Sequence, residues 1–259
     1  MTRCLVTGAG KRLGRAMALY LAGRGFDVAL HCSASRDGAE AAAADIRALG
    51  RRAEVLQADF LDETEVQSLF RRATEALGGP VTCLVNNASI FEYDTVASAT
   101  RASWDRHLDS NLRAPFVLTQ GMAAQGLQPL IDDDGEPVAV GLIVNIIDQR
   151  VLKPTPEFMT YTIAKMALWA MTRTTAQALA PAIRVNAIGP GPTLKAERQS
   201  PDHFARQRAA TILKRGAGPS DLTAALGYLL DARAVTGQLI CVDGGQHLGW
   251  QTPDVLGVE

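Results

Sequence analysis

The stretch Thr7-Gly-Ala-Gly-Lys-Arg-Leu-Gly14 joins a short apolar run at residues 3–7 to an amphipathic segment at residues 13–24. The two patterns predict a strand and a helix. Glycine permits a tight turn and a close approach of the backbone to a ligand. The N-terminus of the following helix offers free N–H groups and its positive dipole end to an anion. This unit therefore favours a site for a dinucleotide pyrophosphate, with an ordinary βα turn as the alternative.

The rest of the chain repeats this alternation of apolar runs and helical patterns. Seven strand-like runs predict an α/β fold: a doubly wound, Rossmann-type parallel sheet of seven strands with right-handed crossovers and helices on both faces. No change of composition marks a linker, so residues 1–259 are expected to form a single domain. The predicted strands are residues 3–7, 26–31, 53–58, 81–85, 138–147, 183–188 and 239–242, and the predicted helices are residues 13–24, 38–49, 62–77, 103–120, 158–179 and 220–230.

Two segments depart from this alternation of strand and helix patterns. Residues 132–137, Asp-Asp-Asp-Gly-Glu-Pro, predict a solvated acidic loop. Residues 189–207 show no periodicity, and long irregular segments in compact domains often act as lids. Residues 189–214 are therefore a candidate substrate lid, with simple surface variation as the alternative. In the last predicted helix, Ser220 is the expected N-cap.

Composition excludes several classes of function. The chain has 26 Lys and Arg residues against 27 Asp and Glu residues, a net charge of −1. This balance provides no basic surface for nucleic acid or for an anionic membrane. The four cysteines form no Cys-x-x-Cys pair, and the histidines have no metal-binding spacing, so neither a disulfide framework nor a metal site is expected. No signal segment opens the sequence, and its apolar runs are too short to span a bilayer, which predicts a cytoplasmic protein.

The segment Tyr161-Thr-Ile-Ala-Lys165 carries a candidate catalytic pair. Its first and last residues are four apart on a predicted helix, so both project from one face. A phenol has a pKa of about 10, and a neighbouring ammonium group favours its ionised form. Such a tuned group suits the proton transfer that accompanies hydride transfer. A packed tyrosine beside a surface lysine is the alternative.

Three further motifs accompany this pair: Asn86-Asn-Ala88 at a strand end, Gly189-Pro-Gly191, and Val242-Asp-Gly-Gly245. With the glycine turn, they resemble the short-chain dehydrogenase/reductase family over essentially the whole chain. Arg12 stands where this family usually has the middle glycine of the turn. The resemblance implies a nicotinamide-dependent oxidoreductase acting on a small molecule, and a homotetramer with helices 103–120 and 158–179 at an interface. It also implies that Asn111 helps to hold a water molecule linking the lysine to solvent.

The end of the second predicted strand indicates which nicotinamide nucleotide binds. An NAD site would place an acidic side chain there, but residues 28–36 contain no Asp or Glu. They offer His31, hydroxyl groups and an arginine, while Lys11 and Arg12 lie in the facing turn. These groups suit the 2′-phosphate of NADP(H), with a solvated surface cluster as the alternative. By motif and resemblance, the predicted cofactor-binding residues are Gly8, Lys11, Arg12, Leu13, Gly14, His31, Ser33, Ser35, Asp59, Phe60, Asn87, Ala88, Tyr161, Lys165, Pro190 and Gly191.

One position departs from the family in an informative way. Short-chain reductases usually have a serine thirteen residues before the tyrosine, and here that residue is Asp148. A carboxylate would repel the oxyanion formed from a ketone, but it suits a C=N substrate whose nitrogen gains a proton. It could also bind the amidine-like edge of a flat heterocycle. The alternatives are a member that has lost its chemistry, or a hydroxyl supplied by Thr155 or Thr160.

With the turn and His31, Asp148 makes the chain similar to the pteridine reductases and dihydromonapterin reductases. In these enzymes the pterin stacks between the nicotinamide and an aromatic ring, and Phe91 is the matching position, with loop packing as the alternative. The resemblance implies a substrate site of Arg12, Ser89, Phe91, Asp148 and Tyr161. It implies an NADPH-dependent reductase of pterins or dihydrofolate. A carbonyl reductase of sugars, acyl groups or steroids is a second hypothesis, and a non-catalytic nucleotide-binding regulator is a third, against which the catalytic residues argue.

Overall fold

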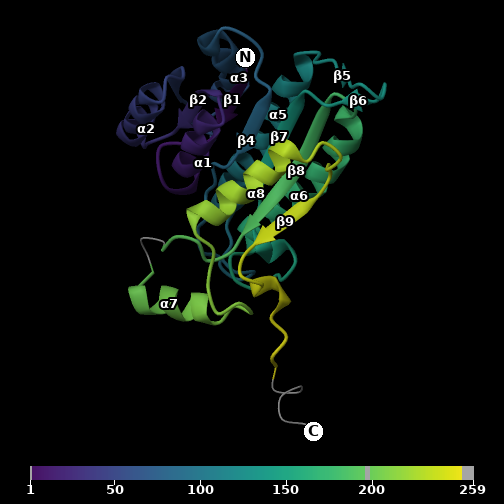
Figure 1. Ribbon diagram of the computed structural model, residues 1–259. Coiled ribbons are helices and arrows are strands. Elements are labelled where there is room, and N and C mark those ends of the chain that lie inside the picture. Colours follow the sequence, from purple (N-terminus) through teal and green to yellow (C-terminus); the bar gives the residue numbers. More distant parts are fainter. Residues whose placement is uncertain (1, 196–198, 253–259) are drawn as a thin grey trace.

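The computed structural model describes residues 2–195 and 199–252 and contains a seven-stranded parallel sheet (Figure 1). Its strand order is β3-β2-β1-β4-β7-β8-β9, so the winding direction reverses between β1 and β4. In such sheets ligands bind beyond the carboxyl ends of the strands beside this reversal. The strands are β1 (Arg3–Val6), β2 (Asp27–Cys32), β3 (Ala53–Gln57), β4 (Cys83–Asn86), β7 (Gly141–Ile146), β8 (Ile183–Pro190) and β9 (Leu239–Val242).

Helices cover both faces of the sheet because the side chains of each strand alternate between them. Val6 and Leu30 pack in a core beneath α1, α2 and α8, whereas Leu5 and Leu84 pack in a core beneath α3 and α5. The predicted fold is therefore confirmed. The helices are α1 (Arg12–Gly23), α2 (Arg36–Ala48) and α8 (Pro219–Asp231) on the first face, and α3 (Glu63–Leu77), α5 (Ala114–Ala124) and α6 (Met159–Leu179), with α4 (Arg101–Leu108) packed on α6, on the second.

The single helix predicted over residues 103–120 is wrong in one respect. The chain forms α4, then one π-helical turn, η1 (Asp109–Arg113), and then α5. A capping box between Thr100 and Ser103 starts α4 two residues earlier than predicted. The π turn matters because such turns are frequent at functional sites, and this one carries the fully buried Asn111.

The candidate lid contains a helix that the sequence pattern did not reveal. Its α7 (Pro201–Ala209) begins after Ser200, whose hydroxyl accepts a hydrogen bond from the His203 N–H at 3.1 Å. Figure 1 shows α7 beyond the carboxyl ends of the strands, apart from the two helical layers. Residues 196–198 of the candidate lid lie outside the described residues. The aperiodic reading of residues 201–207 is therefore wrong, and the lid itself stays a prediction.

Three smaller differences concern element boundaries. The acidic residues 132–136 are exposed or nearly so, as predicted, but they form the turn of a small hairpin between β5 (Leu130–Ile131) and β6 (Pro137–Val138). The strand expected from residue 138 begins at Gly141. Ser220 is not an N-cap, because α8 begins at Pro219 and Asp221 Oδ2 instead accepts the Gly218 N–H at 2.7 Å.

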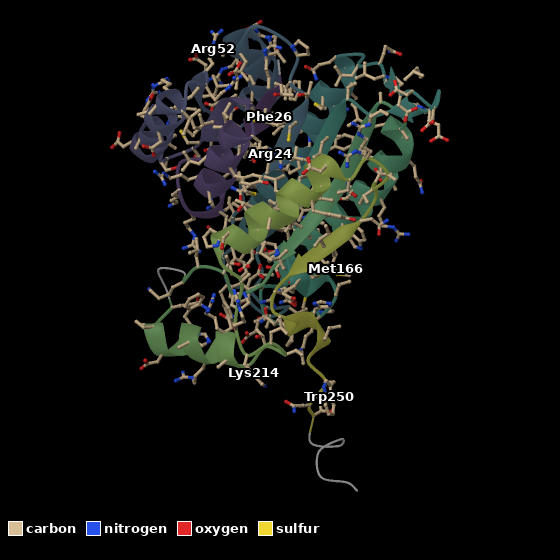
Figure 2. All side chains as sticks on the ribbon, viewed as in Figure 1. Arg24, Phe26, Arg52, Met166, Lys214 and Trp250 are labelled. Atoms are coloured by element: carbon tan, nitrogen blue, oxygen red, sulfur yellow. The ribbon has the colours of Figure 1, made fainter. Side chains whose placement is uncertain are left out.

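Beyond β9 the chain passes through η3 (Gln246–Leu248) into a tail that leaves the body of the molecule. Trp250, labelled in Figure 2, lies on this tail with 59% of its surface exposed. Among the helices that the structure describes, none has the length and apolarity needed to cross a membrane.

Candidate active site

Two adjoining cavities open beyond the carboxyl ends of the strands. The first, of about 380 Å³, follows the glycine turn, and the second, of about 290 Å³, lies between η2 (Gln149–Val151), α6 and the segment after β8. They share four lining residues: Arg12, Leu13, Asn87 and Ser89. A molecule lying in one cavity can therefore reach into the other.

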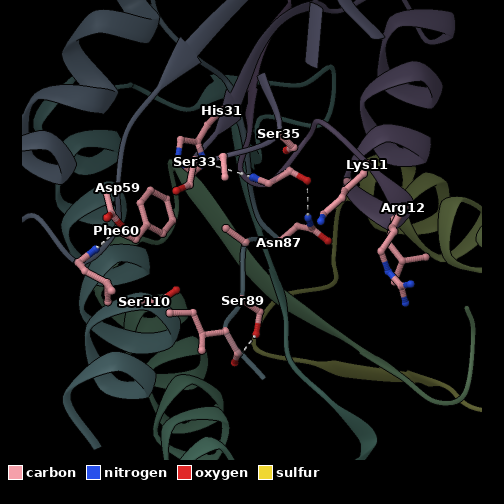
Figure 3. A pocket seen from close by; sticks show the side chains of 17 residues that line it. Lys11, Arg12, His31, Ser33, Ser35, Asp59, Phe60, Asn87, Ser89 and Ser110 are labelled. Atoms are coloured by element: carbon pink, nitrogen blue, oxygen red, sulfur yellow. Dashed lines mark hydrogen bonds between the residues drawn. The ribbon is translucent and has the colours of Figure 1, made fainter. Parts of the chain in front are cut away.

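Every predicted cofactor residue from Gly8 to Ala88 in the chain lines the first cavity (Figure 3). The turn is packed so closely at Gly14 that a side chain is excluded there, since a Cβ on Gly14 would lie 2.1 Å from the Gly8 carbonyl oxygen. Thr7 Oγ1 fastens the turn to the end of β4 by accepting the Asn87 and Ala88 N–H groups, both at 2.9 Å. A bare backbone at the start of α1 is what a bound pyrophosphate requires, so these residues fit a dinucleotide.

Arg12 has a backbone conformation that glycine adopts more readily than other residues. Its φ of 54° lies in the left-handed region, which costs a non-glycine residue about 1–2 kcal/mol. Its guanidinium crosses to the segment after β8, where Nη1 donates to the Lys195 carbonyl at 2.8 Å and Nη2 to the Leu194 carbonyl at 2.9 Å. Arg12 thus bridges the glycine turn and the candidate lid.

His31 has a structural position inside the first cavity. Its Nδ1 accepts the Gly8 N–H at 3.2 Å, its Nε2 bonds the Ala58 carbonyl at 3.0 Å, and its ring stacks on Phe60 with centroids 4.2 Å apart. Burial lowers the pKa of His31 to about 4, so the ring is neutral at neutral pH. A neutral imidazole supplies no positive charge to a 2′-phosphate, and the exposed cations that line this cavity are Lys11 and Arg12.

The second cavity brings the predicted catalytic side chains together. Tyr161 Oη donates to Asp148 Oδ2 at 2.9 Å, and Asp148 Oδ1 accepts the Arg150 N–H at 2.8 Å. Burial raises the pKa of Asp148, while hydrogen bonds from Arg150 and Tyr161 oppose that shift. Lys165 donates to the Ile146 carbonyl at 2.9 Å, and burial lowers the pKa of Lys165 to about 8. An acid–base cluster with perturbed pKa values in a cavity is typical of an active site.

Asn111 does not line either cavity. Its Oδ1 accepts the Ile90 N–H at 2.9 Å and its Nδ2 donates to the Ile90 carbonyl at 2.8 Å. Through these bonds the π turn holds the loop that carries Ser89 and Phe91. The water-holding role of Asn111 stays a prediction.

The two threonines considered as substitutes for the family serine do not line the second cavity. Thr155 Oγ1 bonds the Arg150 guanidinium. Thr160 Oγ1 is buried, donates to Asp94 Oδ2 at 2.5 Å and bonds His107 Nδ1 at 2.6 Å. Asp148 is therefore the polar group that stands at the serine position.

Phe91 and Tyr161, which both line the second cavity, belong to a row of aromatic rings that continues to Phe158, outside the cavity lining. Phe91 lies with its ring centroid 4.5 Å from that of Tyr161 and stacks on Phe158 at 4.4 Å. Phe158 has a left-handed φ of 57°, an uncommon conformation that concentrates at functional sites. Phe158 was not among the predicted site residues, because neither its type nor its position at a helix start distinguishes it.

Several residues that line the second cavity were also not predicted from the sequence. Phe204 and Gln207 come from α7, whose pattern was not seen as helical, and Gln246 comes from the segment after β9. Pro190 and Gly191, predicted to contact the cofactor, line the second cavity and not the first. The signal for α7 lay in Ser200-Pro201, an N-cap followed by proline at the first helical position.

Comparison with known proteins places this geometry in a family. The model of the short chain dehydrogenase family matches residues 2–203. The chain belongs to this family. It is 30% identical to the 3-oxoacyl-[acyl-carrier-protein] reductase FabG of Staphylococcus epidermidis, over 94% of this chain and 98% of that protein. The expected short-chain reductase is thereby confirmed at the level of the family.

Solved structures extend the comparison. FolM Alternative dihydrofolate reductase 1 from Brucella suis, in complex with NADP, is 45% identical with a TM-score of 0.89, and 98% of each chain is covered. A blue fluorescent protein from a metagenomic library, in complex with NADPH, is 30% identical with a TM-score of 0.83, over 94% of this chain and 97% of the other. These bound nucleotides agree with the predicted cofactor.

Proposed function

We propose that this short-chain dehydrogenase is an NADPH-dependent reductase of a C=N bond in a pterin or dihydrofolate-type substrate, with Tyr161 as the proton donor. The observation that carries the proposal is the contact of Tyr161 with Asp148 at 2.9 Å, in a cavity walled by Phe91. The similarity to the FolM structures supports it, since their name describes a dihydrofolate reductase.

The first cavity holds the cofactor in this proposal. Gly8, Gly14 and the N-terminus of α1 take the pyrophosphate, and Lys11, Arg12, Ser33 and Ser35 take the 2′-phosphate. In the first cavity, Asp59 is the single acidic side chain among the described lining residues, and its Oδ1 accepts the Leu61 N–H at 3.0 Å. When bound, NADPH supplies the hydride.

The chain's own residues supply the proton and the orientation. Phe91 offers a flat apolar surface to the heterocycle, and Asp148 offers carboxylate oxygens to its N–H edge. Tyr161 gives its hydroxyl proton to the ring nitrogen. The Lys165 ammonium, 5.7 Å from the centre of the tyrosine ring, stabilises the negative charge left on the phenol.

An NADPH-oxidation assay with dihydrobiopterin, dihydromonapterin and dihydrofolate tests the proposal, with a ketone and a 3-oxoacyl thioester as comparison substrates. We expect turnover with at least one dihydropterin, and kcat/KM for it above that for the ketones. Turnover of ketones or thioesters with none of the dihydropterins would contradict the proposal.

A carbonyl reductase is the second candidate, favoured by the 30% identity to FabG over nearly the whole chain. Asp148 argues against it, because a carboxylate beside the tyrosine would repel a developing oxyanion. The third hypothesis, a non-catalytic regulator, would leave the assembled Tyr161, Asp148 and Lys165 without a role. The thioester arm of the same assay separates the first two hypotheses.

The assembly and location that the resemblance implies are part of the proposal. We infer a homotetramer, in which a second copy covers the groove between α4, η1, α5 and α6, whose apolar lining residues are Leu108, Leu112, Phe116 and Met171 and whose charged ones are Asp109 and Arg113. We place the protein in the cytoplasm, where reducing conditions suit its four free cysteines. Light scattering of the purified protein tests the tetramer, and a monomer at micromolar concentration would contradict it.

A further inference from the structure

We propose that Arg150 binds a carboxylate on the tail of the substrate, so that the enzyme favours folate-type dihydropterins over dihydropterins with short neutral side chains. This inference rests on the proposed function, since it assigns the tail of the substrate whose ring lies near Tyr161. It adds a recognition site on the wall of the second cavity, away from the reacting atoms.

The position of Arg150 follows from the aromatic row. The chain leaves β7 at Ile146, reaches Asp148, and enters η2, which carries Arg150 on the wall of the second cavity. The guanidinium carbon lies 5.3 Å from the centre of the Phe158 ring. Since Phe158 stacks on Phe91, and Phe91 contacts Tyr161, the row runs from the catalytic hydroxyl to a cation. Phe91 and Arg150 both line the second cavity, so a ring beside Phe91 has a positive charge within the same cavity.

Some N–H donors of the Arg150 guanidinium make no hydrogen bond to the described residues. Its Nη1 bonds Thr155 Oγ1 and the Glu157 carbonyl, whereas Nη2 makes no hydrogen bond with any residue that the structure describes. Its Nε is closed off from solvent and likewise has no partner within the described part of the chain. No carboxylate of residues 2–195 or 199–252 forms an ion pair with it. Because Nε is closed off and Nη1 is bonded, the two N–H donors of Nη2 are the ones left for a substrate.

The charge around the cavity favours an anion. Its charged lining residues, among those described, are Arg12, Asp148, Arg150 and Lys165, three cations and one carboxylate. Both oxygens of the carboxylate already accept hydrogen bonds, from Arg150 N and from Tyr161 Oη. An acidic substrate tail therefore meets net positive charge, and Nη2 can donate a charge-assisted hydrogen bond to its carboxylate.

The contact of the Arg150 guanidinium with the Phe158 ring orients it in the absence of substrate. Phe158 and the bonds to Thr155 and Glu157 hold it in one place, so little side-chain entropy remains to be lost on binding. Arg150 is also close enough for its charge to lower the pKa of Asp148. A role through Asp148 would affect every dihydropterin alike, whereas a role in tail binding discriminates between substrates.

The test compares dihydrofolate, which carries two carboxylates on its tail, with dihydrobiopterin, whose side chain is neutral. We expect Arg150→Met to lower the ratio of kcat/KM for dihydrofolate to that for dihydrobiopterin by about 10–150-fold, the value of one charge-assisted hydrogen bond. The loss should lie mainly in KM, because the tail does not react. Arg150→Lys should retain part of the preference, and Lys153→Met, which removes a nearby exposed cation outside the cavity lining, should leave the ratio unchanged.

A binding measurement gives a second readout. Calorimetry on the NADP+ complex should show that Arg150→Met weakens folate far more than biopterin, and that added salt weakens folate binding to the wild type. An unchanged ratio, or equal losses for both pterins, overturns the inference and leaves the proposed function standing. Failure of the wild type to reduce either pterin overturns both. If Arg150→Met does not fold, Arg150→Lys decides the question by the same ratio.

Discussion

The hydroxyl of Tyr161 donates a hydrogen bond of 2.9 Å to the carboxylate of Asp148, which lies thirteen residues earlier in the chain. The negative charge of Asp148 opposes ionisation of the phenol, while the Lys165 ammonium favours it. In the proposed reaction the hydroxyl supplies the proton, and the Lys165 ammonium stabilises the negative charge left on the phenol oxygen. Such an arrangement suits a group that gives a proton to substrate.

Replacing Tyr161 with Phe should remove the proton donor and leave the nucleotide cavity intact. We expect turnover to fall by about 10²–10⁴, the usual contribution of acid–base catalysis, with NADPH affinity nearly unchanged. Stopped-flow measurement of NADPH oxidation, with fluorescence titration of NADPH as the control, checks both parts. Turnover close to that of the wild type would remove Tyr161 from the mechanism.

Two substitutions of Asp148 test separately how its charge and its size affect the choice of substrate. Asp148→Ser introduces the residue usual in the family, and we expect kcat/KM for dihydropterins to fall by about 10–150-fold while ketone reduction improves. Asp148→Asn keeps the size but cannot ionise, so it should also lose dihydropterin reduction. The three proteins are compared on a dihydropterin and a ketone. Equal profiles in all three would refute a role for Asp148 in choosing the substrate.

The enzyme should bind NADPH more tightly than NADH because Lys11 and Arg12 lie at the first cavity, where Asp59 is the one acidic lining residue described. Each strong charge-assisted contact to the 2′-phosphate contributes about 1.5–3 kcal/mol, or about 10–150-fold in affinity. Lys11→Met should lower the affinity for NADPH more than that for NADH. Titration of both nucleotides into both proteins checks this, and equal binding of the two by the wild type would be the contrary result.

The burial of His31 leads us to expect that the free energy of unfolding falls in acid. Its pKa is lowered to about 4 in the folded protein against about 6.5 in the unfolded chain, so the unfolded chain binds more protons between these values. Stability should therefore fall as the pH drops from 6.5 to 4, by up to about 3 kcal/mol from this residue. His31→Phe keeps the stacking on Phe60 but cannot take up a proton. Urea unfolding across this pH range should give a shallower dependence for this variant, and parallel curves would contradict the assignment.

Several features of the fold and site were determined by the sequence alone. The alternation of short apolar runs with amphipathic segments predicted the seven strands. A short apolar run suits a buried strand, whereas apolar residues spaced three or four apart suit a helix. The glycine turn between a strand and a helix predicted the nucleotide site at the first cavity, because glycine permits a tight turn and a close backbone approach to a pyrophosphate. Tyr161 and Lys165 lie on one helix face because four residues make about one helical turn.

Other features depended on contacts between distant segments. The same pattern of side chains suits an α-helix and a π turn, so only the packed structure revealed η1 around Asn111. The hydrogen bond between Asp148 and Tyr161 requires the path from β7 through η2 to α6, which no local pattern specifies. Phe158 and Arg150 became neighbours through the same path. The neutral state of His31 follows from burial, and burial is a property of the folded chain that local sequence does not contain.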